Sequence, residues 1–149
     1  MKGWLLDTSV LSLLAPGRPA PAEAFAVWLR GHADRLHIST ITVAEIEQGI
    51  CKLRRAGGME RAERLTRWLD AVIGLHGQRI LPLDALVARL AGALSDQAIA
   101  TGRHPGFADV AIAATARAHE LMLLTCNGRH FEPLGIAHHD PLDGPPPGA

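Results

Sequence analysis

The sequence is poor in cysteine, has no excess of either charge, and contains no long hydrophobic run. Its two cysteines, Cys51 and Cys126, have no close-spaced partner, which excludes a disulfide framework and a cysteine-ligated metal site. We expect both to be buried as small apolar side chains. No stretch approaches the roughly 18 uncharged apolar residues that a membrane-spanning helix needs, and no segment has the form of a signal peptide. These absences predict a soluble cytoplasmic protein without a membrane partner.

The balance of 15 Lys and Arg against 15 Asp and Glu excludes a net field that would draw nucleic acid to the whole molecule. The distribution of the basic residues is uneven, because many of them fall between positions 52 and 67. They are Lys52, Arg54, Arg55, Arg61, Arg64 and Arg67. A basic rim beside an acidic pocket suits a polyanion that is handled through metal ions. Charge alone is equally compatible with a solvated helical face.

Short apolar runs near residues 4, 37, 80 and 122 are typical of strands, and segments with a 3.6-residue period lie between them. This alternation predicts an α/β protein with three α/β/α layers and a mostly parallel sheet of four to five strands, the fifth at residues 136–138. Gly57 and Gly58 separate two amphipathic segments, which predicts a protruding helical hairpin that carries the basic residues.

The length and the 48% hydrophobic content suit one domain with a real core. We place this domain at residues 1–142. Residues 143–149 are rich in proline and glycine and have almost nothing to bury, so we expect a flexible tail.

The first apolar run ends in Asp7, which is followed by Thr8 and Ser9. In open parallel sheets, ligands bind beyond the carboxyl ends of the strands, so Asp7 is a candidate functional acid. The structural alternative is that Thr8 or Ser9 caps the following helix, with Asp7 favouring its positive end.

Two further acids also have a structural and a functional interpretation. Thr42 and Glu45 have the spacing of a capping box, and Ile41 and Ile46 have that of a hydrophobic staple, so helix capping alone explains Glu45. Asp109 is the only charge in an apolar helical segment, where an unpaired carboxylate is costly unless a metal ion or hydrogen-bond donors receive it. Its first-turn position supplies some donors.

These three acids and the loop from Thr125 to His130 are expected to meet where strands end and helices begin. Carboxylates without a histidine or cysteine cage suit a hard cation, which indicates Mg²⁺, with Mn²⁺ as the alternative. Mg²⁺ takes one or two carboxylates directly, keeps waters and binds substrate phosphate oxygens. Metal-dependent phosphodiester hydrolysis is therefore the leading chemistry.

Four ordered segments resemble the motifs of PIN-domain ribonucleases, and most closely those of VapC toxins of the FitB-like group. They are Leu5–Val10, Ser39–Ile46, Asp109–Ala116 and Thr125–Phe131. The resemblance runs from about residue 3 to residue 142, and the four motifs in order are specific together. It implies a Mg²⁺-dependent endoribonuclease toxin that forms a homodimer and is inhibited by a cognate antitoxin. It further implies a larger assembly with the antitoxin, which carries the DNA-binding domain and provides the only route to DNA.

The resemblance also implies roles for individual residues. It assigns catalysis and metal binding to Asp7, Glu45 and Asp109, and a place in the pocket lining to Ser9, Thr125, Asn127 and His130. The family often has a fourth acid at the position of His130, and this departure weakens the expectation of a second metal ion and of full activity. The basic residues Arg54, Arg55, Arg61 and Arg64 are candidates for contact with RNA or with a partner chain.

Two other functions remain open. Because of His130, the chain is also compatible with a catalytically weakened PIN domain that acts mainly as an antitoxin-binding co-regulator of its operon. A phosphatase with Asp7 as nucleophile would need an acid at Ser9 and is disfavoured. Four other histidines do not have the spacing of metal ligands on one helix face, and we interpret them as surface or core residues. They are His104, His119, His138 and His139.

Overall fold

Five short strands form one sheet in the order β3-β2-β1-β4-β5, and every neighbouring pair is parallel. The strands are β1 (Gly3–Leu6), β2 (Leu36–Ser39), β3 (Ile80–Leu81), β4 (Leu121–Leu124) and β5 (His138–His139). The computed structural model describes residues 2–147. It confirms the predicted parallel sheet and places the fifth strand slightly later than the expected residues 136–138.

The central strand β1 is buried on both faces, which explains its uninterrupted apolar sequence. Trp4 and Leu6 pack into one hydrophobic cluster and Leu5 packs into the other. Gly3 is required at the start of β1 for close packing, because a Cβ there would lie 2.5 Å from the carbonyl oxygen of Arg35.

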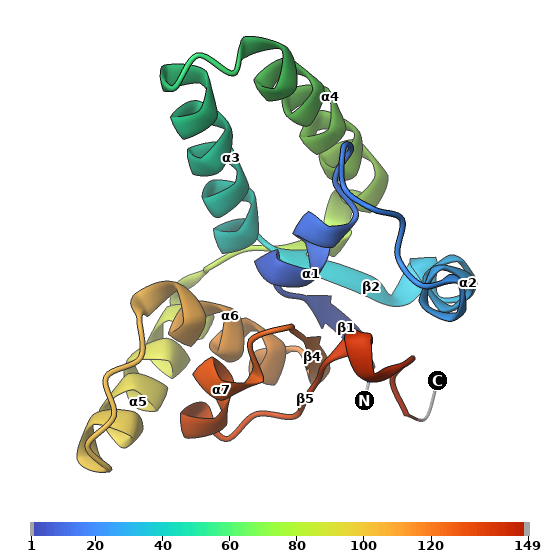
Figure 1. Ribbon diagram of the computed structural model, residues 1–149. Coiled ribbons are helices and arrows are strands. Elements are labelled where there is room, and N and C mark those ends of the chain that lie inside the picture. The colour runs from blue at the N-terminus through green and yellow to red at the C-terminus, as the bar shows by residue number, and fades with distance from the viewer. Residues whose placement is uncertain (1, 148–149) are drawn as a thin grey trace.

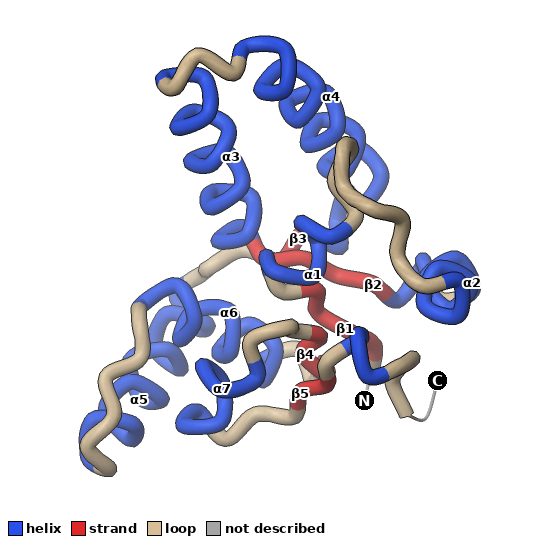
Figure 2. The backbone as a smooth tube through the Cα atoms, viewed as in Figure 1, coloured by secondary structure: helices blue, strands red, loops and turns tan. Residues whose placement is uncertain are grey.

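Helices cover both faces of this sheet, as Figures 1 and 2 show. On the Leu5 face lie α5 (Ala85–Ala100), α6 (Phe107–Ala118) and the short α7 (Gly128–Phe131). On the Trp4 face lie α1 (Thr8–Leu13), α2 (Glu23–Gly31), α3 (Thr40–Arg55) and α4 (Met59–His76). The helices α3 and α4 form the predicted hairpin, which extends away from the sheet (Figure 1).

Short 3-10 helices complete the regular elements of the described chain. They are η1 (Ala33–Arg35), η2 (Gly77–Arg79), η3 (Glu132–Leu134) and η4 (Pro141–Asp143). Among residues 2–147, no helix combines the length and the apolar character that a bilayer-spanning segment requires.

Two sequence expectations need correction. Cys51 is exposed, because it lies on the outward side of α3. Cys126 is only half-buried, at the edge of the hydrophobic cluster that contains Trp4 and Leu6. The C-terminal segment also buries more than its composition suggested, because Pro141 and Pro146 are both buried. Residues 148–149 of the expected tail lie outside the described residues. The flexibility of the tail and the domain boundary at residue 142 remain predictions.

Candidate active site

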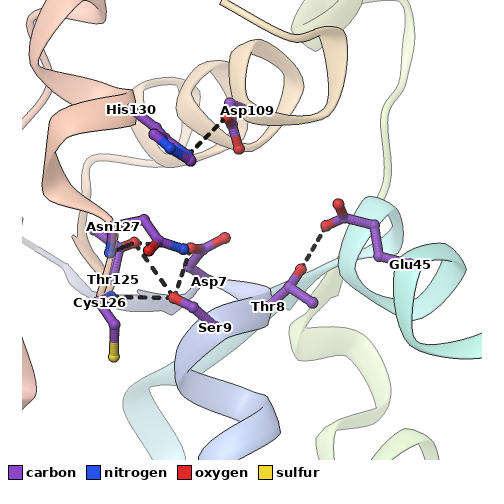
Figure 3. A network of polar contacts seen from close by, with 9 residues as sticks. All are labelled: Asp7, Thr8, Ser9, Glu45, Asp109, Thr125, Cys126, Asn127 and His130. Atoms are coloured by element: carbon purple, nitrogen blue, oxygen red, sulfur yellow. Dashed lines mark hydrogen bonds and ion pairs between the residues drawn. The ribbon is translucent and has the colours of Figure 1, made fainter. Parts of the chain in front are cut away.

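Three acids from different parts of the chain face one space at the carboxyl ends of the central strands (Figure 3). Asp7 directly follows β1, Glu45 lies in the second turn of α3, and Asp109 is the third residue of α6. Thr125 and Asn127 enter from the segment that follows β4. The parallel sheet creates this convergence, because each strand delivers its last residues to the same edge.

Asp7 is held in place by two hydroxyl groups. It is only 5% exposed, and its Oδ2 atom accepts hydrogen bonds from Ser9 Oγ (2.9 Å) and Thr125 Oγ1 (2.8 Å). Ser9 Oγ in turn accepts from the Cys126 backbone N–H, and Thr125 Oγ1 accepts from that of Asn127. Both backbone groups therefore orient hydroxyl protons toward Asp7. Its Oδ1 atom forms no hydrogen bond with the described residues 2–147.

The alternative in which Thr8 or Ser9 caps α1 is not supported, because Asp7 occupies the N-cap position and its side chain makes no capping hydrogen bond. Asp7 does lie at the positive end of α1, as that alternative expected. Thr8 and Ser9 belong to the first turn, and their hydroxyls point to Glu45 and Asp7 instead.

Glu45 contacts a residue that is distant in the sequence. The Thr8 hydroxyl lies 2.6 Å from Glu45 Oε1, to which it donates, and 2.9 Å from Thr42 Oγ1. The capping-box interpretation of Glu45 is wrong, because α3 begins earlier than the spacing suggested. Its N-cap is Ser39, whose Oγ accepts from the backbone N–H of Ile41, and Thr42 is buried inside the first turn.

Asp109 has a different environment, with His130 as its partner. His130 Nδ1 lies 3.4 Å from Asp109 Oδ2, so the imidazole faces the acid although its side chain is 58% exposed. Burial raises the pKa of Asp109 above its usual value. His130 opposes this rise in pKa, whereas the negative charges of Asp7 and Glu45 add to it. Asp7 and Glu45 thus each repel the charge on Asp109 across a shared space.

The donor set fits a hydrated hard cation. Within residues 2–147, no three acids, histidines or cysteines are close enough to form a complete ligand shell. Mg²⁺ does not need such a shell, since it uses one or two carboxylates and completes its octahedron with water and phosphate oxygens. Asp7, through its free Oδ1, and Asp109 would hold such a cation, and its positive charge would offset the repulsion at Asp109.

Only some of the basic residues of the hairpin lie beside an acid. A cavity of about 500 Å³ between α1, α3 and α4 reaches Glu45, and among the four predicted contact arginines only Arg61 lines it. The exposed Arg54 donates to Thr66 Oγ1, while Arg55 and Arg64 are exposed elsewhere on the hairpin. Arg18 and Lys52 also line the cavity.

Sequence reasoning missed one residue near the acids. Thr8 was considered only as a cap, and its contact with Glu45 depends on the packing of α1 against α3. His104 was interpreted as a surface or core histidine, and it is exposed; it also lines a cavity together with Asp109 and His130. Its loop position shortly before Asp109 was the signal for this approach to the site. His119, by contrast, lines none of the cavities that contain the acids.

Comparison with known proteins agrees with this arrangement. The PIN domain family matches residues 4–135. The chain is 33% identical to Toxin FitB of Neisseria gonorrhoeae over 92% of its own length and 96% of that protein. It is 34% identical to VapC ribonuclease Y4jK of Sinorhizobium fredii, over 89% of this chain and 92% of the relative.

Solved structures show the same fold. The crystal structure of FitAcB from Neisseria gonorrhoeae aligns with a TM-score of 0.78 at 33% identity, covering 93% of this chain and 97% of that one. The DNA-bound VapBC structure from Salmonella typhimurium aligns with a TM-score of 0.79 at 26% identity, covering 94% and 98%. The chain therefore belongs to the PIN domain family, among the toxins of FitAB and VapBC toxin-antitoxin systems.

Proposed function

We propose that this protein is a Mg²⁺-dependent endoribonuclease toxin that hydrolyses RNA phosphodiester bonds and is neutralised by a cognate antitoxin. The observation that carries the proposal is the meeting of Asp7, Glu45 and Asp109 at the carboxyl end of the sheet, with mutual repulsion that a cation relieves. The ribonuclease name of one relative supports the choice of RNA as substrate. We also expect the toxin to act in the cytoplasm, where cellular RNA is available as a substrate.

Each acid contributes through a different atom. Asp7 offers Oδ1, because Ser9 and Thr125 hold Oδ2. Glu45 offers Oε2, since Oε1 accepts from Thr8. Asp109 supplies the third negative charge from the opposite wall (Figure 3). A bound Mg²⁺ lowers the pKa of a water molecule and neutralises charge on the phosphate; Mn²⁺ is the expected substitute.

The test is RNA cleavage by antitoxin-free protein. We expect cleavage with Mg²⁺, none with EDTA, and none from Asp7→Asn or Asp109→Asn, because an amide binds the cation poorly while filling the same volume. Asp96→Asn is the matched control, since this exposed acid lies on α5 and lines none of the cavities beside the site. Undiminished cleavage by purified Asp109→Asn removes the site from the mechanism.

Related complexes support the choice of partners. FitAB has been solved with a DNA fragment, and a VapBC complex has been solved with bound DNA. For this chain we expect a homodimer that joins its antitoxin in a larger assembly and reaches DNA only through the antitoxin. The cavity between α1, α3 and α4 is a suitable antitoxin site, because a segment inserted there reaches Glu45. Co-purification with the product of the adjacent gene, followed by light scattering, tests this assembly.

The hairpin arginines are proposed to contact RNA phosphates or the partner chain. Loss of one phosphate contact with a single strand reduces the salt dependence of log K by about 0.7. Replacing Arg61 and Arg64 should therefore weaken RNA binding and flatten its salt dependence. An unchanged slope, combined with weaker antitoxin binding, would assign these residues to the partner interface.

The contact of His130 with Asp109 favours a second candidate function. An imidazole in the place of an acid leaves one fewer negative charge for the cation, and a weakened enzyme would serve mainly as the antitoxin-binding co-regulator of its operon. Antitoxin-free protein without Mg²⁺-dependent ribonuclease activity, but with intact antitoxin binding, would support this function over the first.

A further inference from the structure

A second cavity, of about 370 Å³, opens on the other side of the acids. One wall is the loop between α5 and α6, with Arg103 and His104, and the other is formed by α7 and the turn after it, with Arg129. Asp109 and His130 also line it, so this cavity is continuous with the site in Figure 3.

The charge of this cavity is suited to phosphate. Arg103 and Arg129 are both exposed, and neither forms an ion pair or a side-chain hydrogen bond within residues 2–147. Asp109 is the only acid in the lining, and it already faces His130. Free guanidinium groups bind phosphate oxygens in a two-pronged geometry that lysine does not provide. The two arginines therefore line a cavity with Asp109 and have no side-chain partner in the described part of the chain.

The size and walls of the cavity favour a nucleotide. Small-ligand sites commonly enclose about 300–1,000 Å³, which places this cavity at the small end of the range. Pro105 and Pro133 supply apolar rings at opposite walls, against which a base can pack. On the far side of the acids, the cavity that reaches Glu45 contains Arg18, Lys52 and Arg61. Two of the acids thus border cavities with basic linings, Glu45 the larger one and Asp109 the smaller one.

We propose that the cavity between the α5–α6 loop and α7 is the subsite for the nucleotide next to the scissile phosphate of a single-stranded RNA. Arg103 and Arg129 bind its phosphate, and the two prolines contact its base. This inference rests on the proposed ribonuclease function, since it takes the acids as the position of the scissile phosphate.

Binding is measured separately from cleavage, by fluorescence anisotropy of a labelled single-stranded RNA in EDTA and again in Ca²⁺. Loss of one phosphate contact lowers the salt slope by about 0.7, which corresponds to about fivefold weaker binding at 0.1 M salt. We expect this change for Arg103→Ala and for Arg129→Ala. Arg89→Ala is the matched control, because this exposed arginine lies on α5 outside the cavity.

A second measurement places the subsite relative to the cleaved bond. With Mg²⁺, shortening the RNA on one side of the cleavage position should abolish the difference in kcat/KM between wild type and Arg129→Ala, whereas shortening it on the other side should preserve that difference. If wild type does not cleave but the arginine variants still lose RNA affinity, the ribonuclease function fails and the RNA-binding cavity stands.

Three outcomes overturn the proposal. The first is that Arg103→Ala and Arg129→Ala bind RNA with the same affinity and the same salt slope as Arg89→Ala. Another is no binding of RNA to wild type in either EDTA or Ca²⁺. The third is loss of antitoxin binding in both variants with RNA binding unchanged, which would assign the cavity to a protein partner.

Discussion

Replacement of Thr125 by valine tests whether the hydroxyls around Asp7 position that acid. Thr125 is fully buried, and its hydroxyl donates to Asp7 Oδ2 at 2.8 Å in a buried hydrogen bond. Valine has nearly the same shape but no hydroxyl, so Thr125→Val creates no cavity. It removes this hydrogen bond and also the one that the hydroxyl accepts from the Asn127 backbone N–H. Ser9 remains as the second donor to the same oxygen.

The expected loss of stability follows from the charge of the acceptor. A hydrogen bond to a charged group contributes about 1.5–3 kcal/mol, compared with about 0.5–1.5 kcal/mol for a neutral pair. We therefore expect Thr125→Val to lower the free energy of unfolding by about 2 kcal/mol. In an Asp7→Asn background the acceptor is neutral, and the loss should fall by about 1 kcal/mol, which is the coupling energy of the pair.

Urea unfolding of wild type, Thr125→Val, Asp7→Asn and the double variant measures the coupling energy between the two residues. A Mg²⁺ titration measures the effect of the lost hydroxyl on metal binding. Removal of a group that orients a metal ligand typically costs ten- to a hundredfold in affinity, so Thr125→Val should bind Mg²⁺ at least about tenfold more weakly. Thr125→Ser keeps the hydroxyl and should bind Mg²⁺ like wild type. Equal Mg²⁺ affinity for the valine and serine variants, with zero coupling to Asp7, would refute the reasoning.

Four further predictions concern other groups. Glu45→Gln should abolish RNA cleavage with an unchanged melting temperature, because the amide oxygen can still accept from Thr8; normal turnover would return Glu45 to a structural role. Asp109→Asn should stabilise the metal-free protein at pH 7, since burial and neighbouring charges raise the pKa of Asp109 and disfavour its ionised form; a lower melting temperature than wild type would contradict this. His130→Asp should increase Mg²⁺ affinity and cleavage together, whereas identical titration curves and rates would exclude His130 from metal binding. Burial lowers the pKa of His76 in the folded protein, so the unfolded chain binds more protons below about pH 6.5 and stability should fall as pH drops below that value; thermal melts of His76→Gln should show a weaker decline, and parallel pH curves for the two proteins would disprove it.

Local patterns in the sequence were sufficient for the architecture. The apolar run that ends in Asp7 predicted a buried strand with a polar tip, and β1 is buried with Asp7 directly after it. The function of that tip remains a prediction. The all-apolar segment around Asp109 predicted a helix buried on several sides, which α6 confirms. Such predictions succeed because burial of regular backbone imposes a repeat of 2 or 3.6 residues on the sequence itself.

The role of Glu45 could not be read in this way. The spacing of Thr42 and Glu45 satisfied a local capping rule, yet Ser39 caps the helix. The contact that decides the matter comes from Thr8, 37 residues earlier in the chain. A local motif competes with contacts from other elements, and only the packing of α1 against α3 determines which one forms.

Sequence by itself therefore determined the strands, the helices and the acids that the sheet brings to one edge, because these depend on periodicity and on parallel topology. The tertiary structure alone decided which oxygen of Asp7 is held, that His130 faces Asp109, and that Arg103 and Arg129 share a cavity beside it. These features depend on side-chain directions and loop paths, which are set by contacts between segments distant in the chain and leave no repeating signal in the sequence.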